Sequence, residues 1–348
     1  MLVIWFLILL VSFYFLARIS DEYFIVSLEK IAGKYNMSSD MTGATLMAIG
    51  SSSPELFVSL ASLLKPGNHA AVGVGTIVGS ALFNILVIIG VSSVVRTAVV
   101  SWQPIVRDSF FYAVSVFLLL LFFKDGVITI YESVIFIGTY IFYVFVVLHW
   151  KGYFPYKDEE SEEREEGPFG KEGESRWLHE RADKLLEKIL PNDKRYYSVF
   201  FLSVLYIGFL SWLLVESAVS IAQILQVPEV IIALTILAIG TSIPDLVSSY
   251  LVAKRGKSSM AISNAVGSNI FDILIGLGLP FFLVIGVFQK DIVVSTSDLY
   301  FTIILLIGSV LGTFFIFLLR KWRVDYKTGY LLIGVYLLYI IWTIVHVS

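Results

Sequence analysis

Long apolar stretches separated by short polar segments make up most of this 348-residue chain. A helix needs about 20 mainly apolar residues to cross a bilayer, and runs of that kind recur along the sequence. A β-barrel would show alternation in segments of about ten residues, which the chain lacks. We therefore expect an all-α polytopic membrane protein. Its ten predicted transmembrane helices are at 2–32, 43–64, 71–95, 109–124, 132–149, 198–225, 229–253, 260–287, 298–319 and 328–346.

A polar stretch at residues 150–197 divides the predicted helices into two sets of five. The expected organisation is a first five-helix unit at 1–149, a linker, and a second five-helix unit at 198–348. Residues 158–174 of the linker are acidic and contain glycine, which is typical of a solvated, disordered segment. A regulatory calcium-binding role for this segment is the alternative. Residues 175–190 predict an amphipathic helix that could lie on the bilayer or dock on the protein.

The positive charges predict the orientation, because cytoplasmic loops are rich in Lys and Arg. With the N-terminus outside, 22 of the 25 Lys and Arg residues lie on the cytoplasmic side, and only Lys65, Lys124 and Lys290 lie outside. We therefore expect a multi-pass protein of the cell membrane, with both termini outside and the 150–197 loop in the cytoplasm. The N-terminal stretch lacks a basic start and a small-residue cleavage site, so we interpret it as a first span.

Composition narrows the function classes further. The chain is 57% hydrophobic and 15% charged, against about 25% charged residues in a typical soluble domain. It has no basic patch with interleaved aromatic residues, which argues against a nucleic-acid partner. The absence of cysteine excludes disulfides, thiolate metal sites and cysteine nucleophiles. Nothing in the sequence indicates a cofactor or an obligate protein partner.

A short motif occurs once in each half of the chain. Residues 50–55 read GSSSPE and residues 240–245 read GTSIPD; each copy is followed by a second match, VGSALFN at 78–84 and VGSNIFD at 266–272. Each half holds an odd number of predicted helices, so the second copy would cross the membrane in the opposite sense to the first. Inverted repeats with interrupted helices are a recurrent design of secondary transporters.

The motifs place oxygen-bearing groups where the chain is otherwise apolar. Gly and Pro weaken the helix and free backbone oxygens near Ala48 and Ala238, and such irregular backbone at membrane depth needs a cavity or a protein neighbour. The polar pairs are spaced i, i+4, so each pair shares one helix face. They are Ser51 with Glu55, Thr241 with Asp245, Ser80 with Asn84, and Ser268 with Asp272, joined by Ser52 and Ser242. An all-oxygen set suits hard cations such as calcium, and buried acids indicate a functional site.

Other interpretations of the same residues remain open. A single GxSxP motif is commonly only a kink or packing motif, but two copies with matching acids favour a site. A proton/calcium exchanger is an alternative transporter, since buried carboxylates also bind protons. A cation channel and an intramembrane protease are alternatives from other classes. A protease would need two catalytic acids, and the sequence lacks the usual GxGD context for them. We therefore expect a transporter and not an enzyme.

At these residues the chain resembles the calcium/cation antiporter superfamily, over an α1 motif at 43–91 and an α2 motif at 233–280. GSSSPELF at 50–57 and GTSIPDL at 240–246, with the segments that trail them, are similar to the potassium-dependent sodium/calcium exchangers. The resemblance implies a secondary active antiporter that exchanges sodium for calcium, with or without potassium co-transport. It also implies alternating access, in which spans one and six slide across the other helices.

The resemblance also implies roles for single residues. Glu55 and Asp245 would be the main calcium carboxylates, aided by the backbone oxygens of Ser51 and Thr241. Asn84 and Asp272 would complete the central position, and Asp245 and Asp272 match acids implicated in potassium use. An acid at the position of Asp272 also occurs in microbial members that do not use potassium, so potassium use stays open. The implied sodium ligands are the Ala48 and Ala238 carbonyls with Ser52, Ser80, Ser242 and Ser268.

Overall fold

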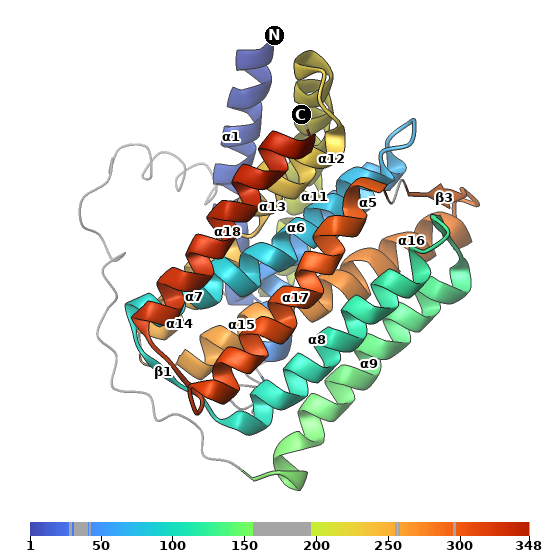
Figure 1. The fold of residues 1–348 in the computed structure, drawn as a ribbon. Coiled ribbons are helices and arrows are strands. Elements are labelled where there is room, and N and C mark those ends of the chain that lie inside the picture. The colour runs from blue at the N-terminus through green and yellow to red at the C-terminus, as the bar shows by residue number, and fades with distance from the viewer. Residues whose placement is uncertain are drawn as a thin grey trace.

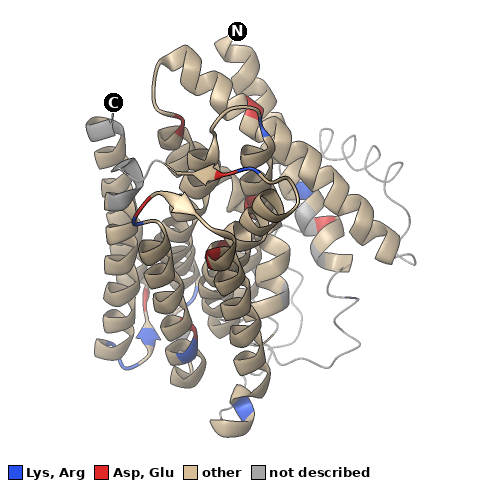
Figure 2. Ribbon diagram, turned by 90° about the vertical axis from the view of Figure 1, so that its right-hand side faces the viewer, with Lys and Arg blue, Asp and Glu red and all other residues tan. Residues whose placement is uncertain are grey.

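The computed structural model describes residues 1–27, 30, 41, 43–155, 196–254, 256, 258–294 and 297–347 (Figure 1). The acidic segment and the amphipathic helix expected in the linker lie outside these residues. Both ends of the chain lie toward the same end of the helix bundle (Figures 1 and 2). This placement is consistent with an even number of membrane crossings.

The first half is helical, and several of its helices contain a π-helical segment, labelled η. In chain order it contains α1 (Leu2–Ile19), η1 (Ser20–Ile25), η3 (Gly43–Met47), α4 (Ala48–Ser51), α5 (Ser53–Leu64), α6 (Ala70–Phe83), η4 (Asn84–Ile88), α7 (Ile89–Val95), β1 (Ala98–Val99), α8 (Trp102–Phe122), β2 (Val127–Ile128) and α9 (Ile130–Tyr153).

The second half repeats this order with few differences. It contains α11 (Tyr196–Leu225), α12 (Glu229–Ile232), η6 (Ala233–Leu237), α13 (Ala238–Thr241), α14 (Ile243–Lys254), α15 (Ser258–Phe271), η7 (Asp272–Leu277), α16 (Gly278–Gly286), β3 (Ile292–Val293), α17 (Ser297–Leu319), β4 (Arg323–Val324) and α18 (Tyr326–Val347).

The described helices confirm an all-α polytopic membrane protein. Eight of them are long and apolar enough to cross a bilayer, and the bent pair Gly43–Ser51 and Ser53–Leu64 brings the number to nine. Helix α18 lies where the tenth span is predicted. It is not among these nine helices, so the count of ten stays a prediction. The described parts of α1, α9, α11 and α18 also expose large apolar side chains, among them Leu7, Phe142, Phe201 and Leu338.

Two small antiparallel strand pairs tie the halves together, which the sequence did not predict. β1 of the first half pairs with β4 of the second, and β2 of the first pairs with β3 of the second. In chain order, β1 and β3 follow the third helix of their halves, and β2 and β4 follow the fourth. Exchanging the halves therefore converts one strand pair into the other.

Helix α8 begins seven residues before the predicted start of the fourth span, at Trp102 and not at 109. The prediction treated Arg107 as a loop residue on the cytoplasmic side. The structure corrects the loop assignment: Arg107 and Asp108 are buried within α8, and the Arg107 Nε donates to Asp108 Oδ1 at 2.7 Å. Tyr143 of α9 also donates to Asp108 Oδ1, at 3.1 Å. The charges satisfy each other, so the helix continues through them.

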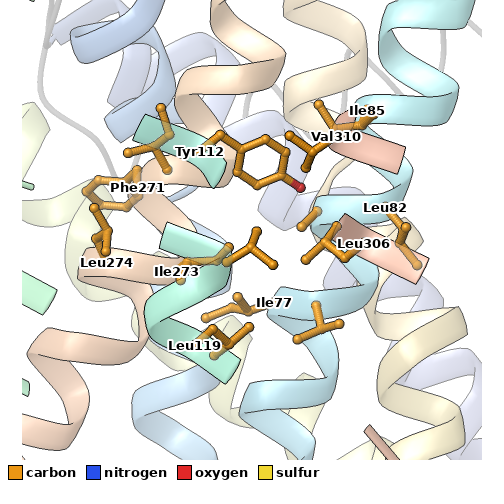
Figure 3. Packing of buried hydrophobic residues seen from close by; sticks show 14 of the residues in the cluster. Ile77, Leu82, Ile85, Tyr112, Leu119, Phe271, Ile273, Leu274, Leu306 and Val310 are labelled. Carbon is orange, nitrogen blue, oxygen red and sulfur yellow. The ribbon is translucent and has the colours of Figure 1, made fainter. Parts of the chain in front are cut away.

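Apolar packing divides into two clusters. The larger joins both halves and includes Tyr112 of α8, which lies between Phe271 of α15 and Val310 of α17 (Figure 3). The smaller joins α1 to α11 and includes Leu9 and Leu214. Helices α1 and α11 thus share an apolar interface, which also contacts the other helices through residues such as Val58 of α5 and Val72 of α6.

Candidate ion-binding site

Both motif copies break their helix at the same motif position. The helical path changes at Ser52 (φ −91°, ψ 7°) and at Ser242 (φ −84°, ψ 4°), and the first break bends the path by 48°. A proline two residues later cannot donate a backbone hydrogen bond. Each break leaves an acid in the first turn of the next helix, Glu55 in α5 and Asp245 in α14. A helix N-terminus favours a carboxylate there.

The Glu55 carboxylate lies in a network of hydroxyl groups from α6 and from the break that follows α13. Its Oε1 accepts hydrogen bonds from Ser80 at 3.3 Å and from Ser242 at 3.2 Å. Ser242 and Ser80 are themselves 2.9 Å apart, and Ser80 lies 3.2 Å from the Ala238 carbonyl and 3.5 Å from the Thr241 hydroxyl. The second carboxylate oxygen, Oε2, accepts no hydrogen bond from the described residues.

The Asp245 carboxylate has one donor from each half. Ser268 donates to its Oδ1 at 2.9 Å and Asn84 donates to its Oδ2 at 3.1 Å. Ser80 with Glu55 and Ser268 with Asp245 occupy equivalent motif positions. Each acid is therefore bonded by the serine of its own half and also by a residue of the other half.

Asp272 is the third buried acid of the two motifs. It begins η7, as Asn84 begins η4, and π-helical turns inside α-helices are frequent at functional sites. Neither Asp272 oxygen accepts a hydrogen bond from the described residues. Its electrostatic neighbours include Ser52, Tyr112 and Tyr140. A buried carboxylate without a donor is costly unless a cation or a proton accompanies it.

The backbone oxygens are less open than the sequence suggested. The Ala48 carbonyl accepts the Ser52 N–H at 3.0 Å, and the Ala238 carbonyl accepts the Ser242 N–H at 3.3 Å. Ser53 donates to the Gly50 carbonyl at 2.9 Å, so it caps the oxygen that Pro54 frees. A carbonyl has two lone pairs, so the Ala48 carbonyl can still accept a second partner, whereas the Ala238 carbonyl already accepts the Ser80 hydroxyl at 3.2 Å.

Two glycines permit the close approach of the halves. A Cβ on Gly79 would lie 2.6 Å from the Leu234 carbonyl oxygen and 2.7 Å from the Ala238 Cβ. A Cβ on Gly267 would lie 2.7 Å from the Ala44 carbonyl oxygen. The two glycines precede Ser80 and Ser268, so each half brings its GS segment against the lead-in to the broken helix of the other half.

The structure buries all the predicted site residues, each with no exposed surface. The hydrogen bonds form two neighbouring groups. One contains Glu55, Ser80, the Ala238 carbonyl, Thr241 and Ser242, and the other contains Asp245, Asn84 and Ser268. Ser51 donates to Met47 O at 2.7 Å and lies beside Asp245, and Ser52 lies beside Asp272.

The sequence prediction missed Asn269, Tyr112 and Tyr140. Asn269 was visible as a difference between the copies, since the first copy has Ala81 at that motif position. The tyrosines belong to α8 and α9, outside both motifs, and only the tertiary fold brings them near Asp272.

In the part of the chain that the structure describes, no three His, Cys, Asp or Glu side chains are close enough to hold one metal ion by themselves. An ion here would need hydroxyl, amide and carbonyl oxygens in addition to carboxylates. Among the described residues, the three acids have hydroxyl, amide and carboxyl neighbours and no hydrogen bond from a Lys or Arg. The arrangement can therefore accept positive charge from a hard cation.

These features define a polytopic helical membrane protein with a buried polar centre made of oxygen ligands from both halves. Residues 5–149 and 195–345 match the model of the sodium/calcium exchanger protein family, and the chain belongs to that family. This confirms the resemblance on which the sequence interpretation depends.

Among its relatives, sodium/potassium/calcium exchanger 4 of Mus musculus is 28% identical, over 96% of this chain and 80% of the relative. Sodium/potassium/calcium exchanger 2 of Homo sapiens is also 28% identical, over 94% of this chain and 75% of the relative. A solved structure of the sodium-calcium exchanger NCX_Mj has a TM-score of 0.62 and 23% identity, over 98% of this chain and 99% of the other. This likeness shows a shared fold.

Proposed function

We propose that the protein is a secondary active antiporter that exchanges sodium for calcium. The observation that carries the proposal is the buried oxygen network in which Asp245 is bonded by Ser268 of its own half and by Asn84 of the other. Membership of the sodium/calcium exchanger family and the relatives named above support it. Exchange follows when sodium and calcium compete for the same oxygens.

The ions act here as substrates, and the residues divide by charge. Glu55 and Asp245 supply the carboxylates for calcium, with the backbone oxygens of Ser51 and Thr241 nearby. Calcium takes six to eight oxygen ligands, so hydroxyls and carbonyls complete its shell. The sodium ligands are the Ala48 and Ala238 carbonyls with Ser52, Ser80, Ser242 and Ser268. Asn84 and Asp272 complete the centre.

The transport mechanism that we propose is alternating access by two inverted five-helix repeats with ten spans in total. The exchangeable strand pairs β1–β4 and β2–β3 support the repeat, as do the reciprocal close approaches of Gly79 and Gly267. The apolar interface between α1 and α11 suits sliding of these two helices across the rest. The Lys and Arg distribution supports termini outside and a cytoplasmic 150–197 linker.

Potassium co-transport is the finer part of the proposal. Asp272 supplies a third carboxylate with no donor among the described residues. Three buried carboxylates suit one divalent ion with a monovalent companion. A potassium ion near Asp272 would provide that charge and lower the cost of burial.

The test is calcium flux in proteoliposomes with sodium, potassium and pH varied separately. We expect an outward sodium gradient to drive calcium uptake. Calcium uptake driven by a pH step in sodium-free buffer would favour proton exchange instead. Flux that runs only downhill and does not couple to sodium would indicate a channel, because channels conduct down the gradient.

A further inference from the structure

Asn269 of α15 is a buried amide that contacts the polar centre from the second half of the chain. Its Oδ1 accepts a hydrogen bond from the Asn84 Nδ2 at 3.0 Å. Its own Nδ2 donates to the Ala81 carbonyl at 2.9 Å. Asn269 has no exposed surface. The amide therefore bridges α6, which carries Ala81, and η4, which Asn84 begins.

The contacts of Asn84 fix the orientation of its amide group. An asparagine side chain has two N–H donors and one oxygen. Asn84 Nδ2 donates once to Asp245 Oδ2, at 3.1 Å, and once to Asn269 Oδ1. Both donors are engaged on one side of the group, and the Asn84 Oδ1 on the other side accepts no hydrogen bond from the described residues. A buried, unpartnered amide oxygen is available as a ligand for a cation.

Removing the acceptor on Asn269 would release half of this constraint. One Asn84 N–H would lose its partner. Rotating the amide by 180° would then break one hydrogen bond, that to Asp245, where in the parent it breaks two. The flipped form would turn a nitrogen toward the ion and an oxygen toward the Asp245 carboxylate. Both changes oppose cation binding, the first by donor geometry and the second by repulsion between two oxygens.

The difference between the motif copies fits this role. Asn269 and Ala81 hold the same motif position, and the Asn269 side chain bonds to the backbone of Ala81 itself. The small side chain at Ala81 suits this close approach by the amide of the other half. The two motif copies thus differ at the position where Asn269 contacts Ala81. Because only the second copy has an asparagine there, the site has one amide held in a fixed orientation, that of Asn84.

We infer that Asn269 is a positioning residue, which directs the Asn84 amide oxygen toward the transported cation. The inference rests on the proposed function. Asn269 also lies beside the Tyr112 hydroxyl, and the inference predicts that the effect of Asn269 on ion affinity passes through Asn84. It adds a positioning role for a residue whose hydrogen bonds go to Asn84 and to the Ala81 carbonyl, and not to the carboxylates of Glu55 or Asp272.

The test is a double-mutant cycle on Asn84→Ala and Asn269→Ala. The readouts are the half-saturating calcium concentration for sodium-driven uptake in proteoliposomes and the melting temperature in detergent. We expect Asn269→Ala to raise the half-saturating concentration roughly three- to tenfold in the parent, as the loss of one net hydrogen bond implies. In the Asn84→Ala background the same change should have less than a twofold effect, since no amide is left to orient.

Asn264→Ala is the matched control. Asn264 lies on the same helix, is also fully buried, and donates to Ser249 at 3.0 Å, away from the acids. It should lower the melting temperature comparably and leave the half-saturating concentration unchanged. Equal effects of Asn269→Ala in both backgrounds, or no effect in the parent, would overturn the inference alone. A parent protein without sodium-driven calcium flux would overturn the proposed function and the inference with it.

Discussion

The amide of Asn84 donates a hydrogen bond to the carboxylate of Asp245 at 3.1 Å, although 161 residues separate the two in the chain. The bond joins η4 of the first half to α14 of the second. Neither half therefore holds a complete polar centre. A change in either half should therefore alter the environment of an acid in the other.

Neutralising either main acid should abolish calcium transport and leave the fold intact. Glu55→Gln and Asp245→Asn keep the shape of the side chain and remove the charge that a divalent ion needs. We expect sodium-driven calcium flux in proteoliposomes to fall to the background, with a melting temperature at or above that of the parent because a buried charge is lost. Glu132→Gln, in the capping box of α9, is the control and should transport normally. Parent-like flux in either site variant would refute the site assignment.

Asp272→Asn should reduce the potassium response more than it reduces calcium transport. Its carboxylate has no donor among the described residues, so it is the acid most in need of a companion cation. We expect the stimulation of calcium flux by potassium to disappear while sodium-dependent flux remains. The measurement is a potassium titration of flux, with the exposed Asp291→Asn as the control. An unchanged potassium response would show that Asp272 has no part in it.

Much of the site could be predicted from the sequence because its information is local. Glu55 and Asp245 follow glycine and proline at fixed spacing. An acid within an apolar helix is costly to bury, so it indicates a functional site. The repeat also predicted Ser80 and Ser268 as site residues, and the structure places each beside the acid of its own half.

The parts that the sequence did not predict depend on contacts between distant elements. The start of α8 was placed too late because Arg107 is charged, and its burial depends on Asp108 and on Tyr143 of α9. The strand pairs β1–β4 and β2–β3 are only two residues long each, too short to leave an alternating pattern. The Gly50 carbonyl was expected to be free, and Ser53 caps it.

Gly79→Ala should destabilise the protein and impair transport. The added Cβ would lie 2.6 Å from a backbone oxygen, that of Leu234, which cannot move without shifting the helix. Overpacking of this kind costs about 1–3 kcal/mol. Thermal unfolding in detergent measures the effect. The control is Gly138→Ala in α9, where a Cβ meets nothing within 4 Å. If both variants melt at the same temperature, the close packing of the halves does not limit stability.

Breaking the buried pair at the start of α8 should be more costly than neutralising an exposed acid. Asp108→Asn leaves the Arg107 guanidinium buried beside a neutral amide, and loss of one partner of a buried ion pair costs roughly 3–5 kcal/mol. We expect a lower melting temperature and less folded protein, whereas Asp125→Asn, on an exposed turn, should match the parent. Replacing both Arg107 and Asp108 by leucine should recover stability relative to Asp108→Asn. If Asp108→Asn melts like the parent, the pair does not stabilise α8.

Asp325 provides a stability contribution that should depend on pH. It precedes α18, and its Oδ1 accepts hydrogen bonds from the Thr328 N–H at 3.0 Å and from the Thr328 hydroxyl at 2.9 Å. These bonds, the backbone one first, hold the pKa of the carboxyl below its ordinary value of 3.8. Because the folded-state pKa is depressed, the stabilisation is present in full above the unfolded pKa and is lost as the pH falls through the folded pKa.

Asp325→Ala should therefore lower the melting temperature at pH 7, and the difference from the parent should narrow as the pH falls below about 4. Asp325→Asn should keep part of the cap, since asparagine is also a good N-cap residue, and its difference from the parent should come mainly from the lost charge. Melting curves of the three proteins between pH 3 and pH 7 test this. A difference between Asp325→Ala and the parent that is constant over that range would show that the charged form of Asp325 does not contribute to the stability of α18.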